Sequence, residues 1–193
     1  MKVLMINGSR RENGCTYTAL EIIGKELKAR GIEYEILHIG TKVTEGQMDE
    51  TVATAVDKMK ESDALIVGSP VYYASPSGEV IAFLDRFWGS AGAYLSYKPA
   101  AAVASARRAG TTATLDVLNK YFMFSSMPVI SSNYWNMVHG NSPEEVMKDL
   151  EGVQIMRNIG INMAWILECI EAGKKENVIK PVPDKKIYTN FHA

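Results

Sequence analysis

The feature that most constrains this chain is a set of short apolar runs in which polar residues do not alternate. The clearest are residues 63–70 and the alanine-rich Ala100–Ala106. A strand of this kind needs apolar cover on both faces, which is typical of a parallel sheet between helices. Segments with helical periodicity separate the runs, so the pattern predicts an α/β fold. The expected strands are residues 3–6, 33–39, 63–70, 100–106 and 128–132, and the expected helices are residues 16–30, 49–60, 80–88, 115–122 and 142–173.

Five strands joined by right-handed helical crossovers favour one arrangement, the flavodoxin-like order 2-1-3-4-5. In such a sheet, ligands bind beyond the carboxyl ends of the strands, where the strand order reverses. The loops that follow the first, third and fourth strands should therefore converge on one ligand. The whole chain, residues 1–193, is expected to form a single domain, with residues 178–193 as an irregular tail containing two prolines.

The first of these loops, residues 7–16, has the composition of a phosphate site. It is polar, contains two glycines and two arginines, and leads into a helix near Thr16. Free N–H groups and the dipole at a helix start favour anions, and arginine adds charge with planar geometry. The loop lacks the Gly-Lys-Ser/Thr of a Walker motif, and Arg10 stands where the dinucleotide fingerprint requires its second glycine. An ordinary strand-to-helix turn capped by Thr16 is the alternative.

The other two loops suit a flat heteroaromatic ring. The second loop carries Tyr72 and Tyr73 beside a turn, and the third carries Arg107 and Arg108 followed by Gly110 and two threonines. Together with one phosphate site they fit flavin mononucleotide (FMN), whose ring needs apolar contact and whose pyrimidine edge needs hydrogen-bond partners. Loop packing for the tyrosines and solvated surface positions for the arginines are the alternatives.

The composition of the chain limits its expected binding partners and cellular compartment. A net charge of −1 and a pI near 6.3 give no electrostatic case for binding nucleic acid or an acidic membrane. Two cysteines, Cys15 and Cys169, form neither a disulfide framework nor a metal site alone. The first apolar run is too short for a signal peptide, and no run is long enough to cross a membrane. We therefore expect a cytoplasmic protein.

Three motifs resemble the NADPH-dependent FMN reductase family of flavodoxin-like proteins. They are the stretches at residues 8–16, 68–73 and 105–112, and residues 82–86 and 127–129 agree with them. The resemblance covers nearly the whole chain. It implies noncovalent FMN, reduction by NADPH or NADH, and assembly as homodimers or homotetramers. The cofactor-binding residues that it and the loop chemistry select are Ser9, Arg11, Asn13, Cys15, Thr16, Pro70, Val71, Tyr72, Tyr73, Ser105, Ala106, Arg107, Arg108, Gly110 and Thr111.

Two departures from the family pattern matter. Proline often follows the serine of the phosphate loop and asparagine often precedes its threonine, where this chain has Arg10 and Cys15. Many close relatives also carry a cysteine-rich segment after the second strand, which in some holds an iron–sulfur cluster. Residues 40–47 contain no cysteine here, so we expect no such cluster and no other metal.

The expected activity is electron transfer from NAD(P)H through FMN to flavin or another small acceptor. The flavin carries the chemistry, so no side chain is expected to act as nucleophile or acid. One alternative keeps the flavin and makes a quinone, azo or nitro compound the acceptor. A second is an electron carrier between proteins, although 22 acidic and 21 basic residues give no sign of an acidic docking face. A third is a nucleotide-binding module without redox chemistry.

Aromatic residues beside the predicted site favour a homo-oligomer with the flavin near the subunit boundary. They are Tyr72, Tyr73, Phe87, Trp88, Tyr94, Tyr134 and Trp135, and Met123, Met127 and Met137 add to them. Tyr134 or Trp135 would then cover the flavin of a neighbouring subunit, although packing is the simpler reading of both. No role is assigned to His139.

Overall fold

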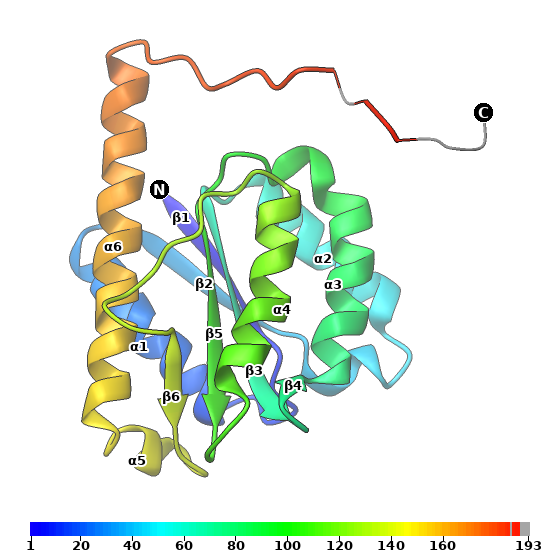
Figure 1. The fold of residues 1–193 in the computed structure, drawn as a ribbon, viewed down its shortest axis with the longest axis vertical. Helices are drawn as coiled ribbons and strands as arrows, with labels where there is room; N and C mark the ends of the chain where they lie inside the picture. Colours follow the sequence, from blue (N-terminus) through cyan, green and yellow to red (C-terminus); the bar gives the residue numbers. More distant parts are fainter. Residues whose placement is uncertain (186, 190–193) are drawn as a thin grey trace.

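A computed structural model describes residues 1–185 and 187–189 (Figure 1). Strands and helices alternate along most of the chain. The strands are β1 (Lys2–Asn7), β2 (Glu33–His38), β3 (Ala64–Tyr72), β4 (Ser75–Pro76), β5 (Ala100–Ala106) and β6 (Met137–His139). The α-helices are α1 (Cys15–Ala29), α2 (Met48–Lys60), α3 (Gly78–Ala91), α4 (Thr111–Phe124), α5 (Pro143–Val146) and α6 (Leu150–Lys175), and the 3₁₀ helices are η1 (Gly40–Val43) and η2 (Gly92–Tyr94).

The main sheet is parallel, with strands in the order β2-β1-β3-β5-β6. The two-residue β4 lies off this path and pairs only with the end of β3, antiparallel. Without β4 the order is 2-1-3-4-5, so the predicted flavodoxin-like arrangement is confirmed. Every residue of β5 is buried, and β3 is buried from Ala64 to Pro70, as their unbroken apolar runs predict.

Helices cover both faces of the sheet, with α1 and α6 on one face and α2, α3 and α4 on the other (Figure 1). Alternate residues of each strand enter the two cores, as the pleat requires. Leu4 and Leu65 belong to the core on the α3 face, whereas Val3 and Ile66 belong to the core on the α1 face. None of the described helices is both long and apolar enough to cross a membrane.

Several residues expected at a subunit interface are instead part of the core. Phe87 is fully buried, and the Trp88 side chain, 8% exposed, packs 5.2 Å from the ring of Tyr121. Met127 and Met137 are buried as well. The interface expectation was wrong for these four because the inner face of α3 and the β5–β6 edge bury them within one chain.

The fifth strand lies later in the chain than predicted. Residues 128–132 form only an isolated bridge between Val129 and Ala100. The chain then leaves the sheet and returns at Asn136, whose carbonyl accepts a hydrogen bond from Ala104 N–H. The Asn136 side chain closes this excursion, accepting from Ser132 N–H and donating to Ile130 O. A buried amide that satisfies the loop's own backbone therefore competes successfully with continued strand pairing.

The last predicted helix is two helices. Ser142 caps α5 by accepting from Glu145 N–H, and Asp149 caps α6 by accepting from Gly152 N–H. Asp149 thus starts a new helix where the sequence suggested a continuous one. After Lys175 the described residues of the tail form neither helix nor strand and extend away from the end of α6 (Figure 1). Residues 186 and 190–193 of the predicted tail lie outside the described residues.

Candidate functional site

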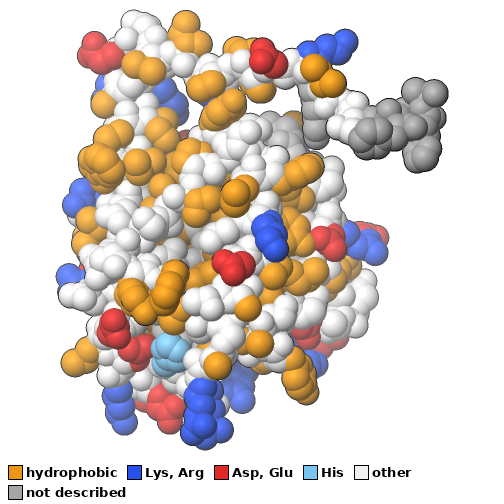
Figure 2. All heavy atoms as spheres, viewed as in Figure 1, with side chains coloured by type: hydrophobic (Ala, Val, Ile, Leu, Met, Phe, Trp, Pro, Cys, Tyr) orange, Lys and Arg blue, Asp and Glu red, His pale blue; other side chains and the backbone are white. Residues whose placement is uncertain are grey.

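A cavity of about 270 Å³ opens where β1, β3, β5 and β6 end. This volume is near the lower end for ligand sites. Figure 2 shows Lys and Arg side chains projecting at this end of the molecule. The cavity is lined by Ser9, Arg11, Cys15, Thr16, Pro70, Val71, Tyr72, Ser105, Ala106, Arg107, Gly140 and Asn141. Apart from Gly140 and Asn141, all of these residues were predicted from the sequence. The structure brings the three predicted loops together, whereas their binding of FMN stays a prediction.

Asn7, the last residue of β1, shapes the first loop. It is fully buried, its Oδ1 accepts from Ser9 N–H at 3.1 Å, and its Nδ2 donates to Glu12 O at 2.8 Å. Ser9 Oγ in turn accepts from Arg11 N–H at 3.1 Å. The predicted side-chain donor Ser9 therefore also organises the loop. Asn7 was not among the predicted site residues because an Asn-Gly pair after a strand indicates only a turn.

The start of α1 faces this loop without a side-chain cap. Gly14 is the N-cap, and the first turn carries no acidic residue. Helices α3, α5 and α6 are each capped by a serine or aspartate side chain. The N–H groups in the first turn of α1 are therefore left available for a ligand, and the helix dipole makes an anion the favoured one.

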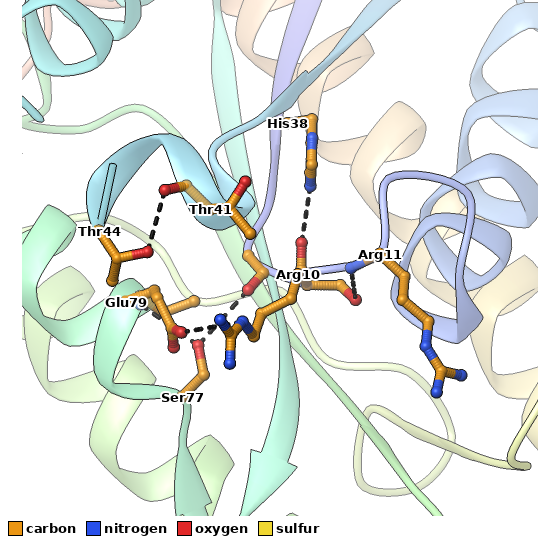
Figure 3. Close-up of polar contacts among 10 residues, drawn as sticks. Arg10, Arg11, His38, Thr41, Thr44, Ser77 and Glu79 are labelled. Carbon is orange, nitrogen blue, oxygen red and sulfur yellow. Dashed lines mark hydrogen bonds and ion pairs between the residues drawn. The ribbon is translucent and has the colours of Figure 1, made fainter. Parts of the chain in front are cut away.

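The two arginines of the loop point in opposite directions (Figure 3). Arg10 Nε lies 3.6 Å from Glu79 Oε1, on the side of α3. Arg11 lines the cavity, and its guanidinium has no hydrogen bond or ion pair within the described chain. Of the two arginines, Arg11 is therefore the one that a ligand in the cavity would meet, whereas its contact with a phosphate stays a prediction.

Two buried hydroxyls join the first loop to the strand beside the cavity. Thr16 Oγ1 and Ser105 Oγ lie 2.7 Å apart, and both side chains line the cavity. Each hydroxyl has one proton, and one of the two is used in this contact. The other remains available to a ligand oxygen.

The second loop is a tight hairpin between β3 and β4. Tyr73 and Ala74 form its tip with φ of 50° and 58°, the conformation of a type I′ turn. Neither is glycine, so the tip is strained. Pro70, Val71 and Tyr72 line the cavity, whereas Tyr73 is fully exposed at the tip and does not.

The third loop offers backbone donors. Gly110 is the N-cap of α4, with φ of 91° and no side-chain cap. A Cβ at Gly110 would lie 2.6 Å from Ala74 Cα, so glycine allows the second and third loops to touch. The N–H groups of residues 107–110 have no acceptor within the described chain. Only Arg107 of these four residues lines the cavity.

Several predicted residues lie outside the cavity wall. Asn13 is exposed on the first loop, and Arg108 and Gly110 are not among the residues that line the cavity. Thr111 is buried, and its hydroxyl donates to Met137 Sδ at 3.2 Å, so it is already engaged. The wall residues Gly140 and Asn141 were missed because the fifth strand was placed too early. Correct placement would have identified the loop after it by the same rule as the others.

Cys15 lies at the edge of the cavity. Its Sγ donates to Gly140 O at 3.6 Å, which links α1 to the loop after β6. Burial raises the pKa of the Cys15 thiol above its ordinary value, so the thiol stays protonated and serves as a weak donor.

Solved structures share the fold. An NADH:FMN oxidoreductase in its apo form aligns with a TM-score of 0.68 at 21% identity, over 86% of this chain and 89% of its own. RosB, solved with a bound 8-demethyl-8-formylriboflavin-5'-phosphate intermediate, aligns with a TM-score of 0.69 at 14% identity, over 100% of this chain and 93% of its own. At these identities the likeness concerns the fold.

A sequence relative is an iron–sulfur flavoprotein of Methanocaldococcus jannaschii. It is 29% identical over 192 residues, covering 89% of this chain and 100% of the relative. Iron–sulfur clusters are usually held by four cysteines. This chain has two, Cys15 at the cavity and Cys169 exposed on α6, so its residues do not fit a cluster. Among the described residues, no three His, Cys, Asp or Glu side chains are grouped to hold a metal ion.

The residues that build the cavity also match a known protein family. The model of the NADPH-dependent FMN reductase family matches residues 1–142, which include all four strand ends and each residue of the cavity wall. The chain belongs to the NADPH-dependent FMN reductase family of FMN-binding oxidoreductases.

Proposed function

We propose that this chain is an NAD(P)H-dependent FMN oxidoreductase that delivers electrons to flavin or another small acceptor. The observation that carries the proposal is the cavity at the strand ends. The start of α1, with its free N–H groups, and Arg11 border it, Pro70, Val71 and Tyr72 form an apolar part of its wall, and Arg107 of the donor-rich third loop lines it as well. Few ligands need a phosphate site, an apolar surface for a ring and a set of hydrogen-bond donors together, and FMN does.

The residues present fit FMN as follows. The first turn of α1 and Arg11 would hold the phosphate, because both offer donors with positive charge. Pro70, Val71 and Tyr72 would lie along the ring. The unpaired N–H groups at Arg107 and beyond would face its pyrimidine edge, where they favour negative charge.

Bound FMN supplies hydride acceptance and electron release, and the protein binds, orients and stabilises charge. Arg107 has no hydrogen bond or ion pair within the described chain and lines the cavity. Its charge would therefore stabilise a reduced, anionic ligand. The cavity wall needs no nucleophile for this role. A quinone, azo or nitro compound is an acceptor of the same class.

An anaerobic titration tests the proposal. The protein is loaded with FMN, freed of excess flavin and titrated with NADPH or NADH while the visible spectrum is followed, with free FMN at the same concentration as control. We expect bleaching of the protein-bound flavin that is faster than that of free FMN, and recovery of the spectrum when a quinone is added.

Two other outcomes separate the alternatives. A protein that binds FMN but is reduced only by dithionite, and not by either nicotinamide, is an electron carrier. A protein that stays colourless and leaves FMN fluorescence unchanged is not a flavoprotein, and the proposal then fails at its first step.

A further inference from the structure

Each edge strand of the sheet ends in a histidine that bonds to a neighbouring loop. His38 is the last residue of β2, and its Nε2 lies 2.7 Å from Ser9 O in the first loop (Figure 3). His139 is the last residue of β6, and its Nε2 lies 3.0 Å from Arg108 O in the third loop. Opposite edges of the sheet therefore support the two loops to which we assign the flavin.

The acceptor in both contacts determines which ring nitrogen of each histidine carries the hydrogen. A carbonyl oxygen only accepts, so Nε2 must carry the hydrogen in each histidine. In a trans peptide the C=O and the following N–H point in opposite directions. The N–H groups of Arg10 and Ala109 therefore point away from the histidines, and neither has an acceptor within the described chain.

Surrounding residues hold both rings in place. His139 N–H donates to Asp149 Oδ2 at 2.7 Å, and the same oxygen lies 3.7 Å from Nδ1 of the ring. Asp149 is itself fixed as the N-cap of α6. Beside His38, a Cβ at Gly40 would lie 2.1 Å from the ring Nε2 and 2.8 Å from Ser9 O, so this corner accepts only glycine.

We propose that His38 and His139 are positioning residues for flavin binding, His38 for the phosphate loop and His139 for the loop at the pyrimidine edge. By holding one carbonyl of each loop outward, each histidine keeps the loop's N–H groups free for the ligand. The inference rests on the proposed function, because it assigns these loops to FMN. It predicts that substitutions of the two histidines differ in their effects on FMN and riboflavin affinity, because riboflavin has the ring but lacks the phosphate.

The test compares two substitutions at each position. Phe keeps a ring of similar size without a donor, and Gln keeps an N–H donor without the ring. Dissociation constants for FMN and riboflavin are measured by flavin fluorescence quenching, and the midpoint potential of bound FMN is measured by spectroelectrochemistry. Thermal unfolding of each variant reports on the fold.

We expect His38→Phe to weaken FMN about threefold to tenfold, the value of one hydrogen bond, and to leave riboflavin unchanged. His139→Phe should weaken both flavins by a similar factor and shift the midpoint potential. His38→Gln and His139→Gln should stay close to the unsubstituted protein in each measurement.

The reverse pattern, with Phe tolerated and Gln damaging, would show that the rings only fill space, and the inference would be wrong. Equal losses of FMN and riboflavin in His38→Phe would overturn the phosphate-loop assignment of His38. An unchanged potential in His139→Phe would do the same for His139. Failure of the unsubstituted protein to bind FMN would instead remove the proposed function itself.

Discussion

Removal of the Arg11 side chain should weaken FMN binding far more than removal of its neighbour Arg10. The two residues are adjacent, share one loop and carry the same charge, so they form a matched pair. Arg11 lines the cavity with no hydrogen bond or ion pair of its guanidinium, whereas Arg10 is drawn toward Glu79 at 3.6 Å (Figure 3).

The expected difference follows from these positions. A charge-assisted hydrogen bond to phosphate is worth about 1.5–3 kcal/mol, so Arg11→Ala should raise the dissociation constant for FMN roughly 10- to 150-fold. The Arg10 side chain is 59% exposed, and exposed ion pairs contribute roughly 0–1 kcal/mol to stability. Arg10→Ala should therefore change FMN affinity less than about threefold, through the weak long-range effect of one exposed charge.

Flavin fluorescence quenching at low and high salt measures both constants. Riboflavin serves as the internal control, because its affinity should not respond to Arg11→Ala. Glu79→Ala adds a second control, because it frees Arg10 to turn toward the cavity. If Arg10→Ala weakened FMN more than Arg11→Ala did, the reasoning from side-chain direction would be refuted.

Four further outcomes are expected. Gly110→Ala should destabilise the fold by about 1–3 kcal/mol in urea unfolding, because residue 110 has φ of 91° and a Cβ would meet Ala74. Gly89→Ala, where a Cβ meets nothing within 4 Å in a helix, should stabilise it by about 0.5–1 kcal/mol. The hydrogen bond from Lys58, and then that from Lys2, lowers the pKa of Glu35 below 4.5, so its stabilisation is present above pH 4.5 and lost as the pH falls through the lowered pKa. Glu35→Gln should therefore flatten the loss of stability in acid, and an unchanged acid profile would exclude Glu35 as its source. Light scattering should give a multiple of 21.3 kDa, because Tyr134, Trp135 and Trp165 are each more than half exposed and Figure 2 shows hydrophobic side chains grouped over the face formed by α6 and α4. A mass of one chain with FMN bound would show that these rings are not an interface.

The sheet order and the position of the cavity could be predicted because they depend on long, unambiguous patterns. β3 and β5 bury nearly every residue, so their sequences have no polar face to confuse them with amphipathic segments. Once those strands are placed, the rule that ligands bind beyond strand ends selects the loops at Ser9, Pro70 and Ala106 without further information. All three residues line the cavity.

The parts of the fold and of the site that could not be predicted depend on contacts between residues that are distant in the sequence. β6 is only three residues long, and Ala104 fixes its entry by bonding to Asn136. The hairpin at Tyr73 and Ala74 adopts positive φ without glycine, so the sequence indicated a turn near these residues but not its left-handed geometry. His139 gained an interpretation only when its partner Arg108 O was known, 31 residues away.

The two departures from the family motif can now be interpreted together. Arg10, where proline is common, turns out of the cavity toward α3, and Cys15, where asparagine is common, directs its thiol to Gly140 O. Neither substitution places a new group against the free N–H groups of the loop. A backbone N–H keeps its donor whatever side chain is attached to the residue, proline excepted. The proposed phosphate site, built mainly from the loop backbone and the start of α1, should therefore tolerate side-chain change at both positions. The side chains whose loss should matter more are those that bond to the loop backbone, Asn7 from inside and His38 from the edge strand.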